Sequence, residues 1–91
     1  MECDVVVVDT GCIYDHPKLA NKNISGIYIH KNQSGKFEIN DSDFVDDVGH
    51  GTAICGTIFS HEPTIKIFVI KIFDEKLYVD ENLLIFALDY I

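Results

Sequence analysis

The feature that most constrains the fold is a pair of apolar runs, at residues 5–8 and 65–73. The first consists of four consecutive valines, and only Lys66 and Lys71 interrupt the second. Unbroken runs rich in β-branched residues are typical of strands that are covered on both faces. We therefore expect two central strands of a parallel sheet.

The rest of the chain predicts a hairpin and two helices. Residues 24–29 and 36–39 are short β-prone runs joined by a turn that contains a glycine. Apolar residues recur four apart after His50, which predicts a short buried helix that begins near this residue. Asp80 can cap a last helix, in which apolar residues recur at helical spacing up to Ile91.

The expected order of elements is strand, hairpin, helix, strand, helix. This alternation indicates an α/β fold, a parallel sheet with flanking helices on both faces and right-handed crossovers. With 91 residues there is room for one domain. Two central strands alone have little to pack on, so we expect residues 1–91 to be part of a larger domain or one half of an assembly.

Composition and charge exclude several classes of protein. A hydrophobic fraction of 47% is that of a packed globular chain, and no apolar run is long enough to span a membrane. The net charge is −8 and there is no arginine, so we expect no nucleic-acid partner. The first residues do not resemble a signal peptide, which predicts a cytoplasmic protein. An odd number of cysteines without a C-x-x-C pair predicts reduced thiols at Cys3, Cys12 and Cys55.

Two residues carry a pattern typical of proton-transfer chemistry. Asp9 follows the first strand at its carboxyl end, where sites form in open parallel sheets. Alone, it could equally be a turn or capping residue. His50 opens a predicted helix between Gly49 and Gly51, which let neighbouring groups approach the ring closely. A histidine that acts as a base needs a carboxylate to fix its tautomer, and Asp9 is the natural candidate.

Three segments together resemble a known family. They are residues 5–11 (VVVVDTG), residues 16–19 (HPKL) and residues 46–57 (DDVGHGTAICGT). In this order they look like the first two signature blocks of the subtilases, the subtilisin-like serine proteases. The run at 67–73 and the helix near Ala87 resemble the strand and helix that follow in that family.

The resemblance implies the front part of a subtilisin-like catalytic domain, acting on a peptide or protein substrate. It implies that Asp9 orients His50, which acts as general base and then general acid in an Asp-His-Ser triad. Val48 and Gly49 would lie beside the substrate cleft. Supporting positions implied in the same way are Thr10, expected to hold the Asp9 carboxylate, and Gly11, Gly51 and Thr52.

The sequence departs from the family pattern in ways that affect activity. The serine block and the oxyanion-hole asparagine of the family are absent from these residues. No serine has the surrounding sequence to replace the nucleophile, neither Ser25, Ser34, Ser42 nor Ser60. We therefore expect the chain alone to be close to inert, and a second chain or a downstream segment to carry the serine. Lys18 stands where the family has a calcium-ligating aspartate, so we expect no cofactor.

Other functions fit parts of the sequence. Asp-Thr-Gly is also the hallmark of retropepsin-like aspartic proteases, whose short chains dimerise, although the second apolar-apolar-Gly element is represented only by Ile54-Cys55-Gly56. A non-catalytic module that binds peptides or completes a partner is suggested by the missing serine.

Metal binding is disfavoured. The cysteines and His16, His30 and His61 match no zinc spacing. The acidic segment that contains Asp41, Asp43, Asp46 and Asp47 is expected to be a solvated turn, because it lacks the ligand order of a calcium loop.

Overall fold

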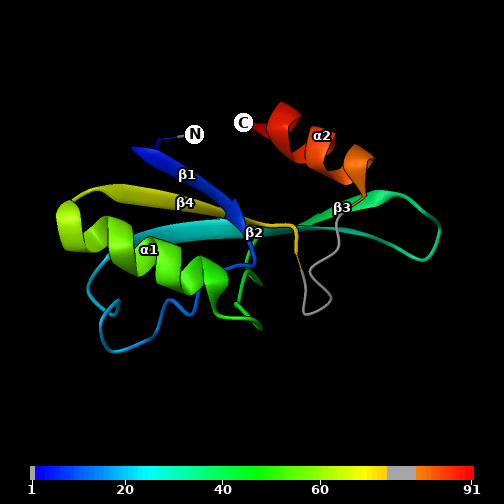
Figure 1. Ribbon diagram of the computed structural model, residues 1–91. Coiled ribbons are helices and arrows are strands. Elements are labelled where there is room, and N and C mark those ends of the chain that lie inside the picture. The colour runs from blue at the N-terminus through cyan, green and yellow to red at the C-terminus, as the bar shows by residue number, and fades with distance from the viewer. Residues whose placement is uncertain (1, 74–79) are drawn as a thin grey trace.

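The chain folds around a four-stranded sheet with one helix on each face (Figure 1). The computed structural model describes residues 2–73 and 80–91. Along the chain the elements are β1 (Val5–Asp9), β2 (Asn23–Lys31), β3 (Phe37–Asn40), α1 (His50–His61), β4 (Lys66–Lys71) and α2 (Glu81–Tyr90). This order confirms the predicted succession of strand, hairpin, helix, strand and helix.

The strands lie in the order β1-β4-β2-β3. Strand β4 is paired in parallel with β1 on one side and with β2 on the other, whereas β3 is antiparallel to β2. The expectation of only two central strands was therefore wrong. Strand β2 is long enough to pair with β4 through residues 23–28 and with β3 through residues 28–31, so the hairpin belongs to the same sheet.

Alternation along β4 explains its continuous apolar sequence. Ile67 and Val69 belong to the core between the sheet and α1, whereas Ile70 belongs to the core between the sheet and α2. Side chains of a strand point alternately to the two faces, so a strand covered on both must be apolar throughout. The first core also contains Val7, Cys12, Leu19, Phe44, Cys55 and Phe59, and the second contains Ile27, Ile29, Ile72, Leu83 and Ala87.

The ends of both helices have local causes. Helix α1 begins at His50, as predicted, after Gly49, which has a positive φ of 107°. Helix α2 begins after Asp80, whose side chain accepts a hydrogen bond from the backbone N–H of Asn82, so the predicted cap is confirmed. Neither helix of the described residues is long and apolar enough to cross a membrane.

Candidate active site

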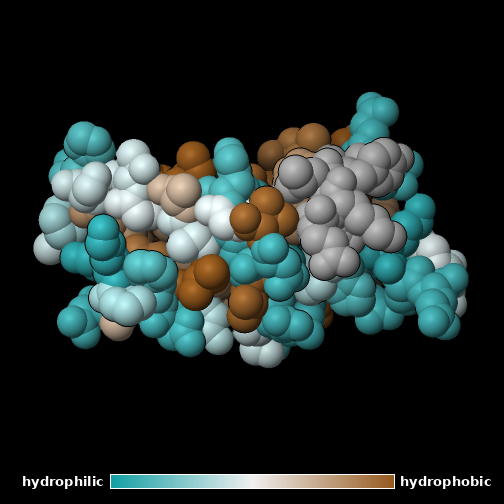
Figure 2. Space-filling model, turned by 60° about the horizontal axis from the view of Figure 1, so that its bottom comes forward, coloured by the Kyte–Doolittle hydropathy of each residue, from teal (hydrophilic) through white to brown (hydrophobic). Residues whose placement is uncertain are grey.

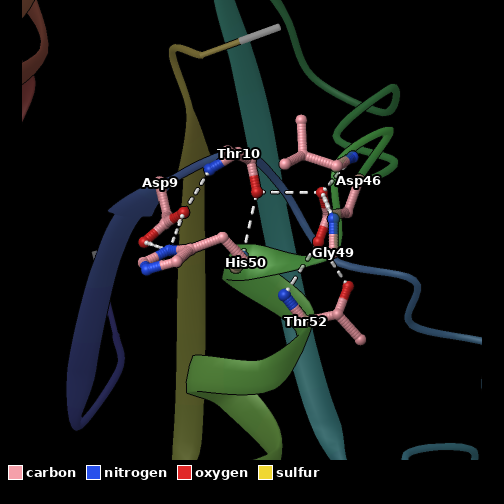
Figure 3. Close-up of polar contacts among 8 residues, drawn as sticks. Asp9, Thr10, Asp46, Gly49, His50 and Thr52 are labelled. Atoms are coloured by element: carbon pink, nitrogen blue, oxygen red, sulfur yellow. Dashed lines mark hydrogen bonds and ion pairs between the residues drawn. The ribbon is translucent and has the colours of Figure 1, made fainter. Parts of the chain in front are cut away.

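Asp9 and His50 meet where β1 ends and α1 begins (Figure 3). Nδ1 of His50 lies 2.9 Å from both carboxylate oxygens of Asp9, Oδ1 and Oδ2. The Asp9 side chain is 15% exposed and that of His50 is 65% exposed. The arrangement therefore offers one partly buried carboxylate and one accessible imidazole, the combination that can move a proton at the protein surface.

Two glycines allow this close approach. A Cβ atom at Gly51, in the first turn of α1, would overlap the carbonyl oxygen of Gly11. Gly11 itself has a positive φ of 106°, and a side chain there would overlap the backbone of Phe44. A side chain at Gly51 would push the start of the helix away from the end of β1, and one at Gly11 would displace the segment from Phe44 to Asp46. Both predicted supporting glycines thus lie at the contact between the two elements.

Thr10 contacts both elements of the site. Its backbone N–H donates to Oδ1 of Asp9 at 2.7 Å. Its hydroxyl donates to Oδ1 of Asp46 at 2.8 Å and accepts from the backbone N–H of Gly51 at 2.9 Å. The sequence predicted that Thr10 would hold the Asp9 carboxylate; the main chain makes that contact, and the hydroxyl serves Asp46 instead.

Asp46 is buried, and its placement corrects the expectation of a wholly solvated acidic turn. It is only 4% exposed, whereas Asp41 and Asp43 are exposed. Oδ1 accepts from Thr10 and from the backbone N–H groups of Val48 and Gly49, at 2.9 and 2.7 Å. The reason is local: the N-cap Gly49 has no side chain, and Asp46, three residues earlier, accepts the hydrogen bonds in its place.

The second oxygen of Asp46 binds the first turn of α1. Oδ2 accepts from the backbone N–H of Thr52 at 2.9 Å and from its hydroxyl at 2.6 Å. The Thr52 hydroxyl in turn accepts from the N–H of Ile13 at 3.0 Å. Burial raises the pKa of Asp46, but the hydrogen bonds from Gly49, Thr52 and Val48 outweigh it and lower this pKa from 3.8 to about 2. Asp46 is therefore a carboxylate at neutral pH.

Lys71 is a second buried charge that the sequence pattern did not reveal. It is 4% exposed and pairs in register with Asp9 across β1 and β4. Its ammonium donates to the carbonyl of Val45 and, at 3.0 Å, to Oδ2 of Asp47, and lies 4.9 Å from the ring centre of Tyr28. Lys71 thus ties the segment around Asp46 to the end of the sheet. In the sequence it is visible only as an interruption of an apolar run.

A hollow of about 320 Å³ opens beside the pair. It is lined by Asp9, Thr10, Val48, His50 and Phe73. Val48, a predicted substrate contact, is in this lining, whereas Gly49 is the N-cap of α1 and is not. Phe73 was not predicted, although its place at the end of an apolar run that follows β4 could have suggested it. On the face shown in Figure 2, apolar side chains reach the surface between polar ones near the middle of the molecule.

The thiols closest to this site are buried. Cys12 and Cys55 are both 0% exposed and belong to the core between the sheet and α1. The hydrogen bond with Cys12, together with burial, raises the pKa of the Cys55 thiol. Cys55 is therefore a neutral thiol at physiological pH, and both side chains act as small apolar groups.

The described residues offer no donor set for a metal ion. Within residues 2–73 and 80–91, no three or more His, Cys, Asp or Glu side chains are grouped so that they could hold one. Lys18 lies in an exposed turn, and its backbone N–H donates to Nδ1 of His16 at 3.1 Å. Its ammonium cannot ligate a cation, so the residues after the His-Pro pair do not fit the calcium site of the resembling family.

Comparison with known proteins identifies the family. The model of the subtilase family matches residues 3–81. An intracellular serine protease from Paenibacillus polymyxa is 35% identical over an alignment of 81 residues, and the match covers 79% of this chain and 24% of that protein. The chain thus spans about a quarter of the length of this relative. None of the solved structures matches it. The two sequence matches show that the chain belongs to the subtilase family.

Proposed function

We propose that the chain provides the Asp and His of an Asp-His-Ser triad in a subtilisin-like serine endopeptidase. The observation that carries the proposal is the 2.9 Å approach of His50 Nδ1 to both carboxylate oxygens of Asp9. Asp9 keeps the proton of the neutral ring on Nδ1, which leaves Nε2 as the base. Asp9 also stabilises the imidazolium that forms when Nε2 takes up a proton.

The reaction follows from this tautomer. Nε2 of His50 accepts the proton of a serine hydroxyl while the serine oxygen attacks the carbonyl carbon of the scissile peptide bond. The same proton then passes from Nε2 to the leaving amine, and the acyl group remains on the serine. Water attacks the acyl-enzyme in a second cycle, in which His50 again acts first as base and then as acid. These steps need no metal or organic cofactor.

The nucleophile comes from polypeptide outside these residues. The chain has four serines, and none of them lines the hollow beside His50. Ser25 lies in β2, Ser34 in the hairpin turn, Ser42 in the segment after β3 and Ser60 near the end of α1. The 24% coverage of the relative supports a downstream segment or a second chain as the source. Residues 1–91 by themselves are then close to inert.

The substrate is a peptide or protein that crosses the hollow next to the pair. Val48 and Phe73 give that hollow an apolar wall, suited to an apolar side chain next to the scissile bond. We place the protein in the cytoplasm, because the relative that it matches is named as an intracellular protease.

A fluorophosphonate probe and peptide hydrolysis test the proposal in the complete protein that contains residues 1–91. We expect the probe to label a serine, pepstatin to have no effect, and His50→Ala to lower kcat by about a thousandfold or more. His61→Ala is the matched control, because His61 is exposed at the far end of the same helix. Full hydrolysis by the His50→Ala variant would refute the proposal.

A non-catalytic module is the second candidate, because residues 1–91 place no serine among the residues that line the hollow beside His50. In that case the complete protein binds peptides without cleaving them, and the fluorophosphonate labels nothing. Acid-dependent cleavage blocked by pepstatin would instead indicate an aspartic protease that uses Asp9 in the Asp-Thr-Gly sequence.

A further inference from the structure

The position of the His50 ring depends on the backbone that carries it. Its side chain is 65% exposed, and among the described residues the only polar partner recorded for the ring is Asp9. Little packing therefore fixes the imidazole. Its distance from Asp9 is set by how the first turn of α1 lies against the end of β1.

One carboxylate connects these two backbone segments. Asp46 accepts hydrogen bonds from the backbone N–H groups of Gly49 and Thr52 at the start of α1, and from the hydroxyl of Thr10 at the end of β1 (Figure 3). In turn, the backbone N–H of Thr10 donates a hydrogen bond to Asp9, and the Thr10 hydroxyl accepts one from the backbone N–H of Gly51. A short hydrogen-bonded path thus runs from Asp46 to each side of the Asp9–His50 contact.

The bonding pattern requires a carboxylate at this position. Five donors converge on the two oxygens of Asp46, and the side chain is almost completely buried. An asparagine of the same shape would direct its NH₂ group either at the N–H of Thr52 or at the donors on the other side. Because two donors cannot hydrogen-bond each other, the amide must leave buried N–H groups unpaired or move the helix.

We propose that Asp46 is a positioning residue for the catalytic pair: it holds the start of α1 so that His50 stays on Asp9. This role rests on the proposed function of the pair in proton transfer. Asp46 is not among the residues that line the hollow beside His50, and it acts through Thr10 and through the first turn of α1. Misplacement of a catalytic group by about 1 Å can cost about a hundredfold in rate, so a positioning residue affects kcat without contacting the substrate.

The test compares Asp46→Asn with Asp43→Asn in the complete protein. Asp43 is an exposed acidic residue of the same segment. Both variants therefore lose one negative charge near the site, but only Asp46→Asn disrupts the hydrogen bonds to the start of α1. For Asp46→Asn we expect kcat to fall about ten- to a hundredfold while KM changes less than about twofold. Asp43→Asn is expected to keep both constants. All assays are run well below the thermal midpoint of each variant.

A second readout does not require hydrolysis. In protein labelled with ¹⁵N-histidine, NMR reports whether Nδ1 or Nε2 of His50 carries the proton. We expect the parent and Asp43→Asn proteins to show the Nδ1-H form held by Asp9. For Asp46→Asn we expect a mixture of the Nδ1-H and Nε2-H forms, as in a ring that Asp9 no longer holds. If the parent protein hydrolyses nothing, the proposed function fails, while the ring spectra still decide whether Asp46 positions His50.

Thr52 provides the check if Asp46→Asn does not fold. Thr52→Val removes the hydroxyl that donates to Asp46 at 2.6 Å, and Thr52→Ser keeps a hydroxyl. We expect Thr52→Val to lower kcat and alter the ring spectrum in the same direction, and Thr52→Ser to recover most of that loss. The proposal is overturned if Asp46→Asn or Thr52→Val lowers thermal stability but leaves kcat and the His50 tautomer as in the parent.

Discussion

Gly51 in the first turn of α1 lies directly against Gly11 after β1, so closely that a methyl group on Gly51 would overlap the Gly11 carbonyl oxygen. The backbone N–H of Gly51 donates to the Thr10 hydroxyl at the same contact. The start of the helix that carries His50 thus packs against the end of the strand that carries Asp9, and the contact is made by backbone atoms of the two glycines. Close packing here, together with the hydrogen bond between His50 and Asp9, brings the two side chains together.

The first prediction concerns this contact. Gly51→Ala must either separate α1 from the turn at Gly11 or deform that turn, so we expect a loss of about 1–3 kcal/mol or more in the free energy of unfolding. Hydrolysis by the complete protein should fall as well, because His50 moves with the helix. Denaturant unfolding and peptide cleavage measure the two effects.

The matched control is Gly56→Ala in the same helix. In the described part of the chain, a methyl group at Gly56 would meet nothing within 4 Å apart from its chain neighbours and the nearby backbone of its own helix. Alanine in a helix is favoured over glycine by about 0.5–1 kcal/mol, so this variant should be as stable as the parent or more so. Equal effects of the two substitutions would contradict the packing argument.

A second prediction follows from the pKa of about 2 that hydrogen bonding gives Asp46. Because folding lowers this pKa below the ordinary value of 3.8, the unfolded chain binds more protons than the native one between these values. The contribution of Asp46 is complete above pH 3.8 and is lost as the pH falls through about 2. We expect the free energy of unfolding to fall over this interval, as measured by urea titrations at several pH values.

The Asp46→Asn variant has no such group to titrate, so its stability should depend less on pH over that interval. Asp43→Asn should retain the slope of the parent, because Asp43 is exposed. If the slope of Asp46→Asn equals that of the parent, the acid sensitivity originates elsewhere.

Burial of two thiols leads to a third prediction. Cys12 and Cys55 are 0% exposed, whereas Cys3 is partly exposed ahead of β1. Because a thiol must be accessible and ionised to react, a water-soluble disulfide reagent should modify Cys3 in the native chain and all three cysteines after denaturation. Thiol titration by absorbance, combined with mass mapping, gives the result. Rapid native labelling of Cys55 would show that α1 opens from the sheet.

The fourth prediction concerns Lys71. Lys71→Met keeps most of the buried stem but removes the donor to Val45 and Asp47 and the cation over Tyr28. Hydrogen bonds from charged groups contribute about 1.5–3 kcal/mol, so we expect a stability loss of about 1–3 kcal/mol. Lys66→Met at the exposed start of the same strand is the control and should change stability by less than about 0.5 kcal/mol. Thermal unfolding compares the two.

The linear sequence determined the elements and the two residues of the pair. Apolar runs and helical spacing are local properties, so they predicted β1, β4, α1 and α2 close to their observed bounds. Asp9 and His50 stood out because each occurs inside a distinctive motif. The parallel pairing of β2 with β4 was missed, since a hairpin signal describes only the adjacent strand.

Only the tertiary structure decided which polar residues are buried and what they hold. Asp46 resembles its exposed neighbours in sequence, and its role depends on Thr10, which lies 36 residues away and contacts it only once the two segments meet in the fold. Lys71 likewise becomes an anchor only once the segment around Val45 crosses the end of the sheet. Local sequence patterns indicate which side chains of a segment face the solvent and which face the core. Hydrogen bonds between distant segments form only when the folded chain brings those segments together.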